Sequence, residues 1–113
     1  MPNACVVFST LPDVEAARKL AKSLVEERLA ACVNVLAPCT SIYRWQGDVR
    51  EDGEVPVIIK TTAERYPALE AHIRKHHPYE LPEIVALNAA AGLPDYLRWI
   101  VDSTLDSNPP SQP

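Results

Sequence analysis

The sequence predicts a protein of the α+β class, and two observations lead to that prediction. Short apolar runs rich in β-branched residues alternate along the chain with segments whose apolar residues recur at helical spacing. The second observation is proline, because the 113 residues include 11 prolines and only 3 glycines. Proline is poorly tolerated inside helices and central strands, so the many prolines indicate where the elements begin and end.

The N-terminal part of the chain is predicted to form a strand and then a helix. Residues 4–8 (ACVVF) have the composition of a buried strand. Apolar residues at helical spacing predict a helix over about residues 13–29. We expect Thr10 to cap this helix and Pro12 to lie in its first turn, where a missing backbone donor costs nothing.

A long hairpin is predicted next. One arm covers residues 31–46 and is interrupted by Pro38, the other covers residues 54–61 and contains Pro56, and turns are expected at 47–48 and 52–53. At about 3.3 Å per residue, a hairpin of some 30 residues overhangs a first strand of about six. An overhanging ribbon exposes unpaired backbone groups, so we expect a symmetric homo-oligomer in which it pairs with another copy.

The C-terminal half adds a helix, a strand and a second helix. A capping-box pattern starts the first helix at Thr61, and Pro78 ends it; a strand at residues 82–88 and a helix opening at residues 92–95 follow. This order of elements is that of a ferredoxin-like sandwich (βαββαβ plus a C-terminal helix), with helices on one face of an antiparallel sheet. We interpret residues 1–106 as one such domain and residues 107–113 as a disordered, proline-rich tail.

Composition argues against several classes of function. The net charge is −4, with no basic run, which argues against a nucleic-acid partner. The chain shows neither a membrane-spanning apolar stretch nor a signal peptide, so we expect a cytoplasmic protein. Three cysteines without a CxxC motif favour reduced thiols over disulfides. Phosphate-binding loops and hydrolase motifs are missing, so we expect neither an enzyme nor an organic cofactor.

Five sequence blocks resemble the CutA divalent-cation tolerance proteins: LAACVNV (29–35), SIYRWQGDV (41–49), EVPVIIKTT (54–62), HHPYELPEIVAL (76–87) and DYLRWI (95–100). Together they cover nearly all of residues 4–105 in order. The resemblance implies a ferredoxin-like subunit in a compact homotrimer, built by pairing long strands between subunits and similar to the trimer of PII-type signalling proteins. It also implies a cytoplasmic protein linked to tolerance of copper and other divalent metals, with direct binding of metal ions.

Three histidines and one cysteine are the candidate metal ligands. His72 and His76 lie four residues apart on one face of the predicted helix, and imidazole suits copper, zinc and nickel. The alternative is that these side chains are cations favoured near a helix C-terminus. The resemblance moves the expected copper binding mainly to His76 and His77. Cys32 lies in a block where members of the resembling family often have cysteine, and its thiolate is a further candidate ligand for copper(I). We interpret it first as a small buried residue. Ser9 stands where some relatives have a further cysteine.

A second set of residues combines aromatic rings with charged groups: Tyr43, Trp45, Lys60, Tyr79, Glu80 and Glu83. Alternation along the strand places Tyr43 and Trp45 on one face of the hairpin. Lys60 and the HPYE segment are expected to meet them across a subunit boundary, in a cleft that suits a small molecule. In the alternative interpretation, the aromatic rings fill the trimer interface and the charges form ion pairs at its rim.

These residues leave three functional hypotheses. The first is a homotrimer that binds copper or similar divalent ions and contributes to metal tolerance. The second is a PII-like regulatory module, in which the intersubunit cleft binds a small effector and the hairpin tips contact a partner. The third is a stable trimeric scaffold whose metal binding is incidental.

Overall fold

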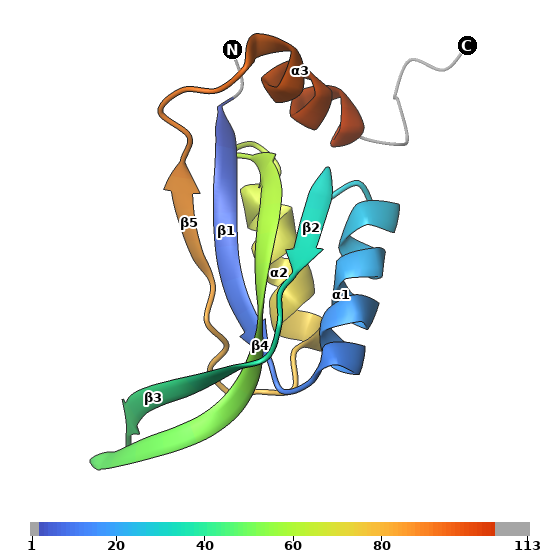
Figure 1. The fold of residues 1–113 in the computed structure, drawn as a ribbon. Coiled ribbons are helices and arrows are strands. Elements are labelled where there is room, and N and C mark those ends of the chain that lie inside the picture. The colour runs from blue at the N-terminus through green and yellow to red at the C-terminus, as the bar shows by residue number, and fades with distance from the viewer. Residues whose placement is uncertain (1–2, 106–113) are drawn as a thin grey trace.

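A five-stranded antiparallel sheet and three helices make up residues 3–105, the part of the chain that the computed structural model describes (Figure 1). In chain order the elements are β1 (Ala4–Leu11), α1 (Val14–Glu26), β2 (Cys32–Val35), β3 (Cys39–Trp45), β4 (Asp48–Thr62), α2 (Tyr66–His76), β5 (Val85–Asn88) and α3 (Pro94–Ser103). The strand order is β2-β4-β1-β5, and β3 pairs with the outer half of β4. The predicted α+β class is confirmed, and so is the order of elements except that the arm predicted at residues 31–46 is two strands, β2 and β3. The predicted tail, residues 107–113, lies outside the described residues.

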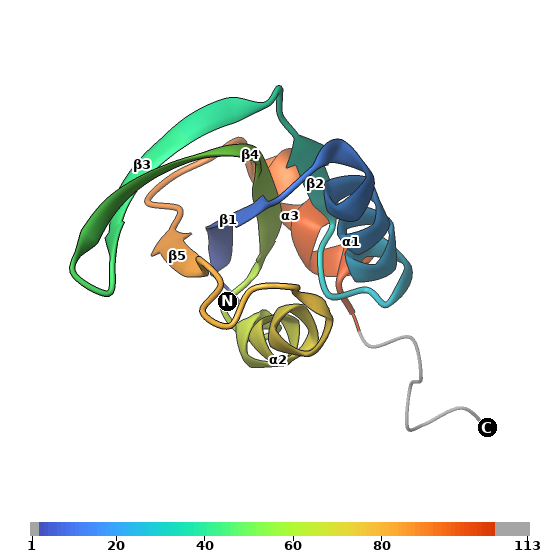
Figure 2. The same cartoon turned by 90° about the horizontal axis from the view of Figure 1, so that it is seen from below.

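Helices α1 and α2 cover one face of the sheet, and the main core lies between them and the strands (Figures 1 and 2). Val7 in β1 and Ile59 in β4 are register partners and are completely buried. Leu24 of α1, with Leu69 and Ile73 of α2, closes over them. Burying one such side chain contributes about 1.5–3 kcal/mol, so this layer is the main source of stability. Helix α3 packs separately, through Ile100, at one end of the sheet.

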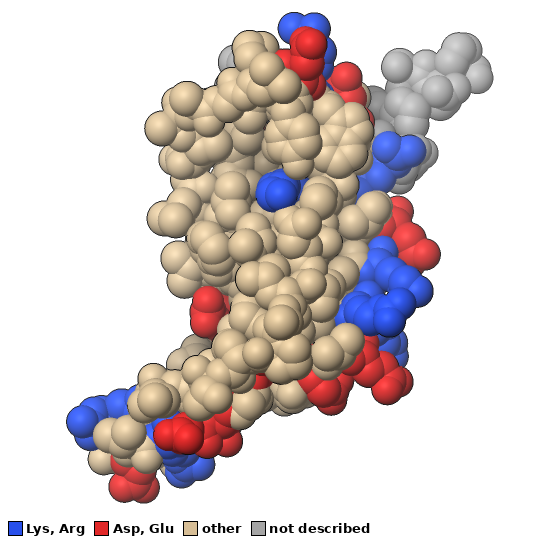
Figure 3. Space-filling model, in the orientation of Figure 1, with Lys and Arg blue, Asp and Glu red and all other residues tan. Residues whose placement is uncertain are grey.

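The opposite face of the sheet carries no helix along most of its length. Strand alternation directs Val6, Phe8 and Ile58 to this face, which we call the helix-free face. Their neighbours on edge strand β5, Val85 and Leu87, are 52% and 56% exposed. Figure 3 shows this face as mostly uncharged, with charged side chains gathered on the hairpin and over α1. A broad apolar face without a covering layer is typical of an interface with another chain.

The predicted hairpin overhang is present. β4 pairs with β1 through residues 55–62 and with β3 through residues 48–54, so the β3–β4 ribbon projects beyond the rest of the sheet (Figure 1). Pro38 lies between β2 and β3, and Pro56 lies in β4 between its stretches of pairing with β3 and β2. The molecule is accordingly elongated, with dimensions of 55 × 30 × 24 Å.

The predicted turn at residues 52–53 was wrong, because β4 continues straight through it. The hairpin reverses once, at Gln46 and Gly47, between the register partners Trp45 and Asp48. Both turn residues have positive φ, 51° and 87°, as a two-residue type I′ turn requires. That strained position carries a glutamine, which is why the sequence alone did not identify it as the only turn of the ribbon.

The start of α1 also differs from its prediction. Thr10 does not cap the helix, because β1 extends to Leu11 and pairs Thr10 with Pro56 of β4. Asp13 is the cap instead: its Oδ1 accepts a hydrogen bond from the Ala16 amide at 2.8 Å. Pro12 therefore precedes the cap rather than lying in the first turn. The helix has 13 residues and is the longest in the described part of the chain, too short to cross a membrane.

The second helix begins later than predicted. Thr61 and Thr62 extend β4, so the capping box that we expected from Thr61 does not form. A turn intervenes, in which the Thr62 hydroxyl accepts a hydrogen bond from the Arg65 amide at 3.2 Å. Helix α2 starts at Tyr66, with Pro67 in its first turn, and ends at His76 immediately before the buried His77.

Candidate functional site

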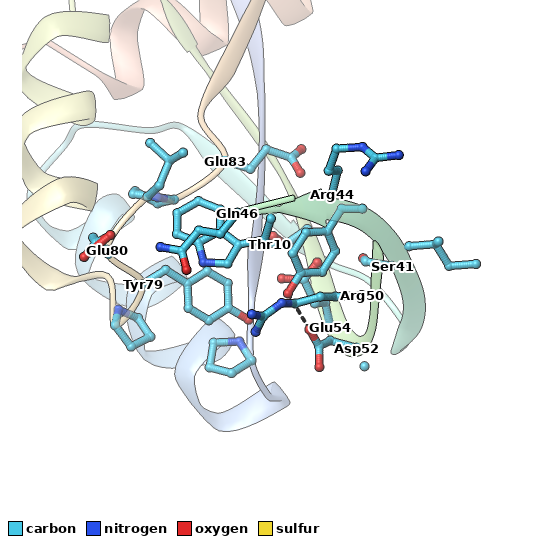
Figure 4. Close-up of a pocket in the computed structure, with 18 residues that line it drawn as sticks. Thr10, Ser41, Arg44, Gln46, Arg50, Asp52, Glu54, Tyr79, Glu80 and Glu83 are labelled. Carbon is cyan, nitrogen blue, oxygen red and sulfur yellow. Dashed lines mark hydrogen bonds between the residues drawn. The ribbon is translucent and has the colours of Figure 1, made fainter. Parts of the chain in front are cut away.

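A solvent-open hollow of about 1130 Å³ lies at the base of the projecting ribbon (Figure 4). Its walls are the inner side of β3 and β4, the end of β1 and the segment that follows α2. Five of the six predicted cleft residues line it: Tyr43, Trp45, Tyr79, Glu80 and Glu83. We had expected these residues to meet only where two subunits adjoin, but the five lie around one hollow within a single chain.

Lys60 does not line this hollow in the described chain, and its expected contact with the cleft across a subunit boundary stays a prediction. It lies six residues from Glu54 along β4, which corresponds to about 20 Å of extended strand. Its Nζ donates a hydrogen bond to Oδ1 of Asn34 at 2.8 Å, on the helix-free face. Sequence proximity to the apolar hairpin suggested a shared cleft, but the length of β4 carries Lys60 to the other end of the sheet.

Two tyrosine–carboxylate pairs form the centre of the hollow. The Tyr43 hydroxyl donates a hydrogen bond to Asp52, and the Tyr79 ring lies beside Glu54, which influences its hydroxyl. Asp52 and Glu54 are two residues apart on β4, so both project from the same side of the ribbon. Figure 4 shows them together near the end of the Tyr79 ring, whereas Glu80 points away.

These pairs fix the charge state of the site. Burial, followed by the hydrogen bond to Glu54, raises the pKa of Tyr79 to about 12. The hydrogen bond to Asp52 is the main cause of a raised pKa at Tyr43, which is exposed to solvent. Both phenols therefore remain protonated donors at neutral pH. Sequence reasoning missed the two carboxylates, because it placed Asp52 in a turn at residues 52–53 and Glu54 at the start of the strand after that turn.

The whole hollow is negatively charged. Four carboxylates line it (Asp52, Glu54, Glu80 and Glu83), against two arginines, Arg44 and Arg50. Arg44 is engaged at the ribbon turn, where its Nη1 donates to the Gly47 carbonyl at 3.2 Å. The surplus of carboxylates beside aromatic rings suits a positively charged partner better than an anionic one.

His77 anchors one wall of the hollow. It is 8% exposed, its Nε2 donates to the Thr10 carbonyl at 2.6 Å, and its Nδ1 accepts from the Tyr79 amide at 3.1 Å. This pattern requires a neutral ring with its proton on Nε2. Both nitrogens are thus occupied, which removes His77 from the predicted metal-ligand set. The family block HHPYE suggested a ligand, but the structure gives this ring a positioning role.

His72 and His76 are brought together on α2 as predicted, with ring centroids 4.3 Å apart. The Ser23 hydroxyl donates to the Leu20 carbonyl at 2.9 Å, so His72 Nε2, also 2.9 Å away, must donate to Ser23 Oγ. His76 Nδ1 donates to the His72 carbonyl at 2.9 Å. The lone pairs of His72 Nδ1 and His76 Nε2 are therefore the two left for a ligand.

The environment of His72 favours its neutral form. Burial lowers the pKa of His72, and the adjacent His76 lowers it further. A neutral imidazole is the form that binds metal ions. Within residues 3–105, however, no group of three histidine, cysteine or carboxylate side chains is placed to hold a metal ion. The pair is a two-ligand arrangement, with the remaining coordination positions open to water or another chain.

Cys32 lies apart from the histidines. It belongs to β2, is opposite Lys60 in register, and projects to the helix-free face with Sγ 4.0 Å from Oδ1 of Asn34. Ser9 faces the opposite side of the sheet and is 1% exposed; within the described chain its hydroxyl has no hydrogen-bond partner. The predicted joint ligand set of Cys32 with the histidines is therefore not assembled within one subunit.

Comparison with known proteins gives a consistent family assignment. The sequence matches the family model "CutA1 divalent ion tolerance protein" over residues 5–103. The divalent-cation tolerance protein CutA of Thermus thermophilus is 52% identical over 99 residues, covering 88% of this chain and 96% of that protein. Protein CutA of Mus musculus is 46% identical over 98 residues, which cover 87% of this chain but only 55% of the mouse protein.

Solved structures agree with the sequence matches. The divalent cation tolerance protein of Thermus thermophilus superposes with a TM-score of 0.88 at 51% identity, covering 89% of this chain and 98% of that one. CutA1 from Oryza sativa gives a TM-score of 0.89 at 41% identity, with 95% and 97% coverage. The resemblance drawn from the five sequence blocks is confirmed, and the chain belongs to the CutA1 divalent ion tolerance protein family.

Proposed function

We propose that this protein is a cytoplasmic homotrimer that binds divalent metal ions, copper among them, and so contributes to metal tolerance. The observation that carries the proposal is the His72–His76 pair, in which the ring centroids lie 4.3 Å apart and one ring nitrogen of each histidine makes no hydrogen bond. Copper ions bind imidazole nitrogen atoms readily. The family name, divalent ion tolerance protein, supports the same class of ligand.

Two features support assembly into a trimer. The helix-free face presents Val85 and Leu87 to solvent in a single chain, next to the half-buried Phe8. The β3–β4 ribbon projects beyond the sheet, and its outer edge is available for pairing with another copy. A closed cyclic assembly covers both surfaces at once, as homo-oligomers commonly do.

The cytoplasmic location is part of this proposal. Cys5, Cys32 and Cys39 are all free thiols, with Cys39 exposed and Cys5 buried. Unpaired cysteines are typical of a reducing compartment. We also propose a binding role rather than an enzymatic one, because the Asp52 carboxylate is engaged by the Tyr43 hydroxyl and no nucleophile–base pair is recognisable among the described residues that line the hollow.

Calorimetric titration with copper(II) tests the metal site. We expect the His72→Ala/His76→Ala double variant to bind copper about tenfold or more weakly than the parent protein. His77→Gln is the matched control, because both ring nitrogens of His77 already make hydrogen bonds within the chain. This variant should bind copper about as tightly as the parent protein. Equal affinity in the double variant and the parent would instead favour the scaffold hypothesis, in which metal binding is incidental.

A nucleotide-binding regulatory module is not favoured by the hollow. The surplus of carboxylates over arginines in its lining would repel the phosphates of a nucleotide. Its described lining also contains no glycine-rich turn for a phosphate group, since Gly53 lies in continuous strand and Gly47 in the hairpin turn. The hollow must therefore be considered with a ligand of the opposite charge.

A further inference from the structure

From the geometry of the hollow we infer that it binds a small organic cation, an ammonium group carrying apolar substituents. The inference is independent of the proposed copper site, since neither His72 nor His76 lines the hollow. It rests on three properties of the site: the aromatic rings, the carboxylates and the way in which tyrosine hydroxyls orient those carboxylates.

Aromatic rings form the first component. Tyr43 and Trp45 come from β3, and Tyr79 comes from the segment after α2, so the rings approach from two different parts of the fold. A cation within about 6 Å of such a ring face is attracted by the quadrupole of the ring, and alkylated ammonium ions use this contact most because they are weakly hydrated. His77 holds the Tyr79 backbone in place, which fixes one ring relative to the others.

Carboxylates supply the charge. The Asp52 carboxylate accepts a hydrogen bond from the Tyr43 hydroxyl, and Glu54 lies beside Tyr79, so both carboxylates keep lone pairs for a ligand. Glu83 adds a third carboxylate, while Arg50 offsets one of them. A monovalent cation therefore improves the local charge balance, and it needs no change in the two tyrosine–carboxylate pairs.

The same groups disfavour other ligands. The carboxylates of the hollow are not grouped for a divalent metal ion, which prefers several converging oxygen donors, and no histidine or cysteine joins them in its lining. An anionic metabolite would bring its charge next to Asp52 and Glu54. At about 1130 Å³ the hollow has room for a small organic molecule and its surrounding water.

Choline and its uncharged isostere provide a direct test. Choline and 3,3-dimethylbutan-1-ol have nearly the same shape but differ by the positive charge. The chain has two tryptophans, so Trp99→Phe, on the exposed face of α3, leaves Trp45 as the only tryptophan reporter. Titrations of the assembled protein are monitored by Trp45 emission and by calorimetry, at constant ionic strength maintained with sodium chloride.

We expect choline to change Trp45 emission saturably and to bind about tenfold or more tightly than the alcohol. Equal binding of choline and the alcohol, or tighter binding of adenosine monophosphate than of choline, would overturn the inference. Loss of copper binding in the His72→Ala/His76→Ala variant would leave choline binding intact, so the two proposals fail separately.

A matched pair of variants locates the site. Glu54→Gln removes one charge while keeping the side-chain shape and an acceptor for Tyr79, and we expect it to weaken choline binding about tenfold. Glu64→Gln removes an exposed carboxylate outside the hollow and should leave binding unchanged. If Glu54→Gln binds choline as tightly as the parent protein, the inferred site is wrong.

Discussion

The ring of His77 joins the Thr10 carbonyl, 67 residues away in sequence, through a hydrogen bond of 2.6 Å. The same ring accepts the Tyr79 amide through its other nitrogen. One buried side chain thus connects the end of β1 to the wall of the hollow. Its environment explains why it is neutral and why it cannot also serve as a metal ligand.

Replacing His77 should destabilise the fold and loosen the wall of the hollow. His77→Ala leaves the Thr10 carbonyl and the Tyr79 amide without their partner, at a cost of about 1–3 kcal/mol. Urea unfolding measures this cost. His76→Ala, an exposed neighbour, is the control and should change the unfolding free energy far less. Similar losses in both variants would show that His77 has no special structural role.

Asp13 should stabilise α1 as its N-terminal cap. Asp13→Ala removes the acceptor of the Ala16 amide and is expected to cost about 0.5–2 kcal/mol. Asp13→Asn keeps an oxygen acceptor and should recover most of the loss. Thermal unfolding of the three proteins checks this order. A large loss in Asp13→Asn would mean that the negative charge at the helix start, rather than the hydrogen bond, provides the stabilisation.

The stability of the protein should fall in strong alkali through Tyr79. Its pKa rises from 10 in the unfolded chain to about 12 in the folded one, so the folded state favours the protonated phenol. The stabilisation is complete below pH 10 and is lost between pH 10 and 12. Urea unfolding across this range should show a shallower decline for Tyr79→Phe than for the parent protein. A decline of equal slope in both proteins would contradict the assignment of this pKa.

Copper binding should weaken in mild acid. Burial and His76 lower the pKa of His72 below 6.5, so this ring stays neutral and able to bind until the pH falls below that value. Protons then compete for the same lone pair. Copper titrations between pH 5 and pH 8 should show weakening at the acid end, and Ser23→Ala should alter the profile by freeing His72 Nε2. A pH-independent affinity would exclude both histidines.

A charge on the helix-free face should separate the subunits. Leu87→Asp places a carboxylate on an exposed side chain, so the single chain should fold normally while the proposed trimer dissociates. Val14→Asp, on exposed α1, is the control and should leave the mass unchanged. Light scattering measures both. A monomeric mass for the parent protein, or a trimeric mass for Leu87→Asp, would contradict the proposed interface.

Much of the fold follows from local sequence patterns, and the differences have physical causes. Residues 4–8 and 31–36 were recognisable as strands because their apolar, β-branched composition suits a buried sheet. The extension of β1 through Thr10 could not be recognised from the sequence, because it depends on the pairing of Thr10 with Pro56, which is far away in the chain. The start of α2 moved for the same reason, since tertiary pairing draws Thr61 into β4.

The candidate site shows a similar division. Residue type and strand alternation made Tyr43, Trp45 and Tyr79 candidates for a cleft between subunits, and in the described chain they line one hollow. Asp52 and Glu54 were missed because identifying them required the correct turn. Placing the turn at residues 46–47 gives the register pair Ser41 and Asp52, which puts Asp52 diagonally next to Tyr43.

Among the strands of the described chain, β4 alone contacts β1, β2 and β3. A nascent chain that has emerged only as far as β3 can form α1, but its strands have no common partner. The β3–β4 hairpin can form once residue 54 has left the ribosome, but complete pairing of β4 with β1 requires residues 55–62 and joins distant parts of the chain. Synthesis of β4 thus sets the earliest moment at which this subunit acquires a native core.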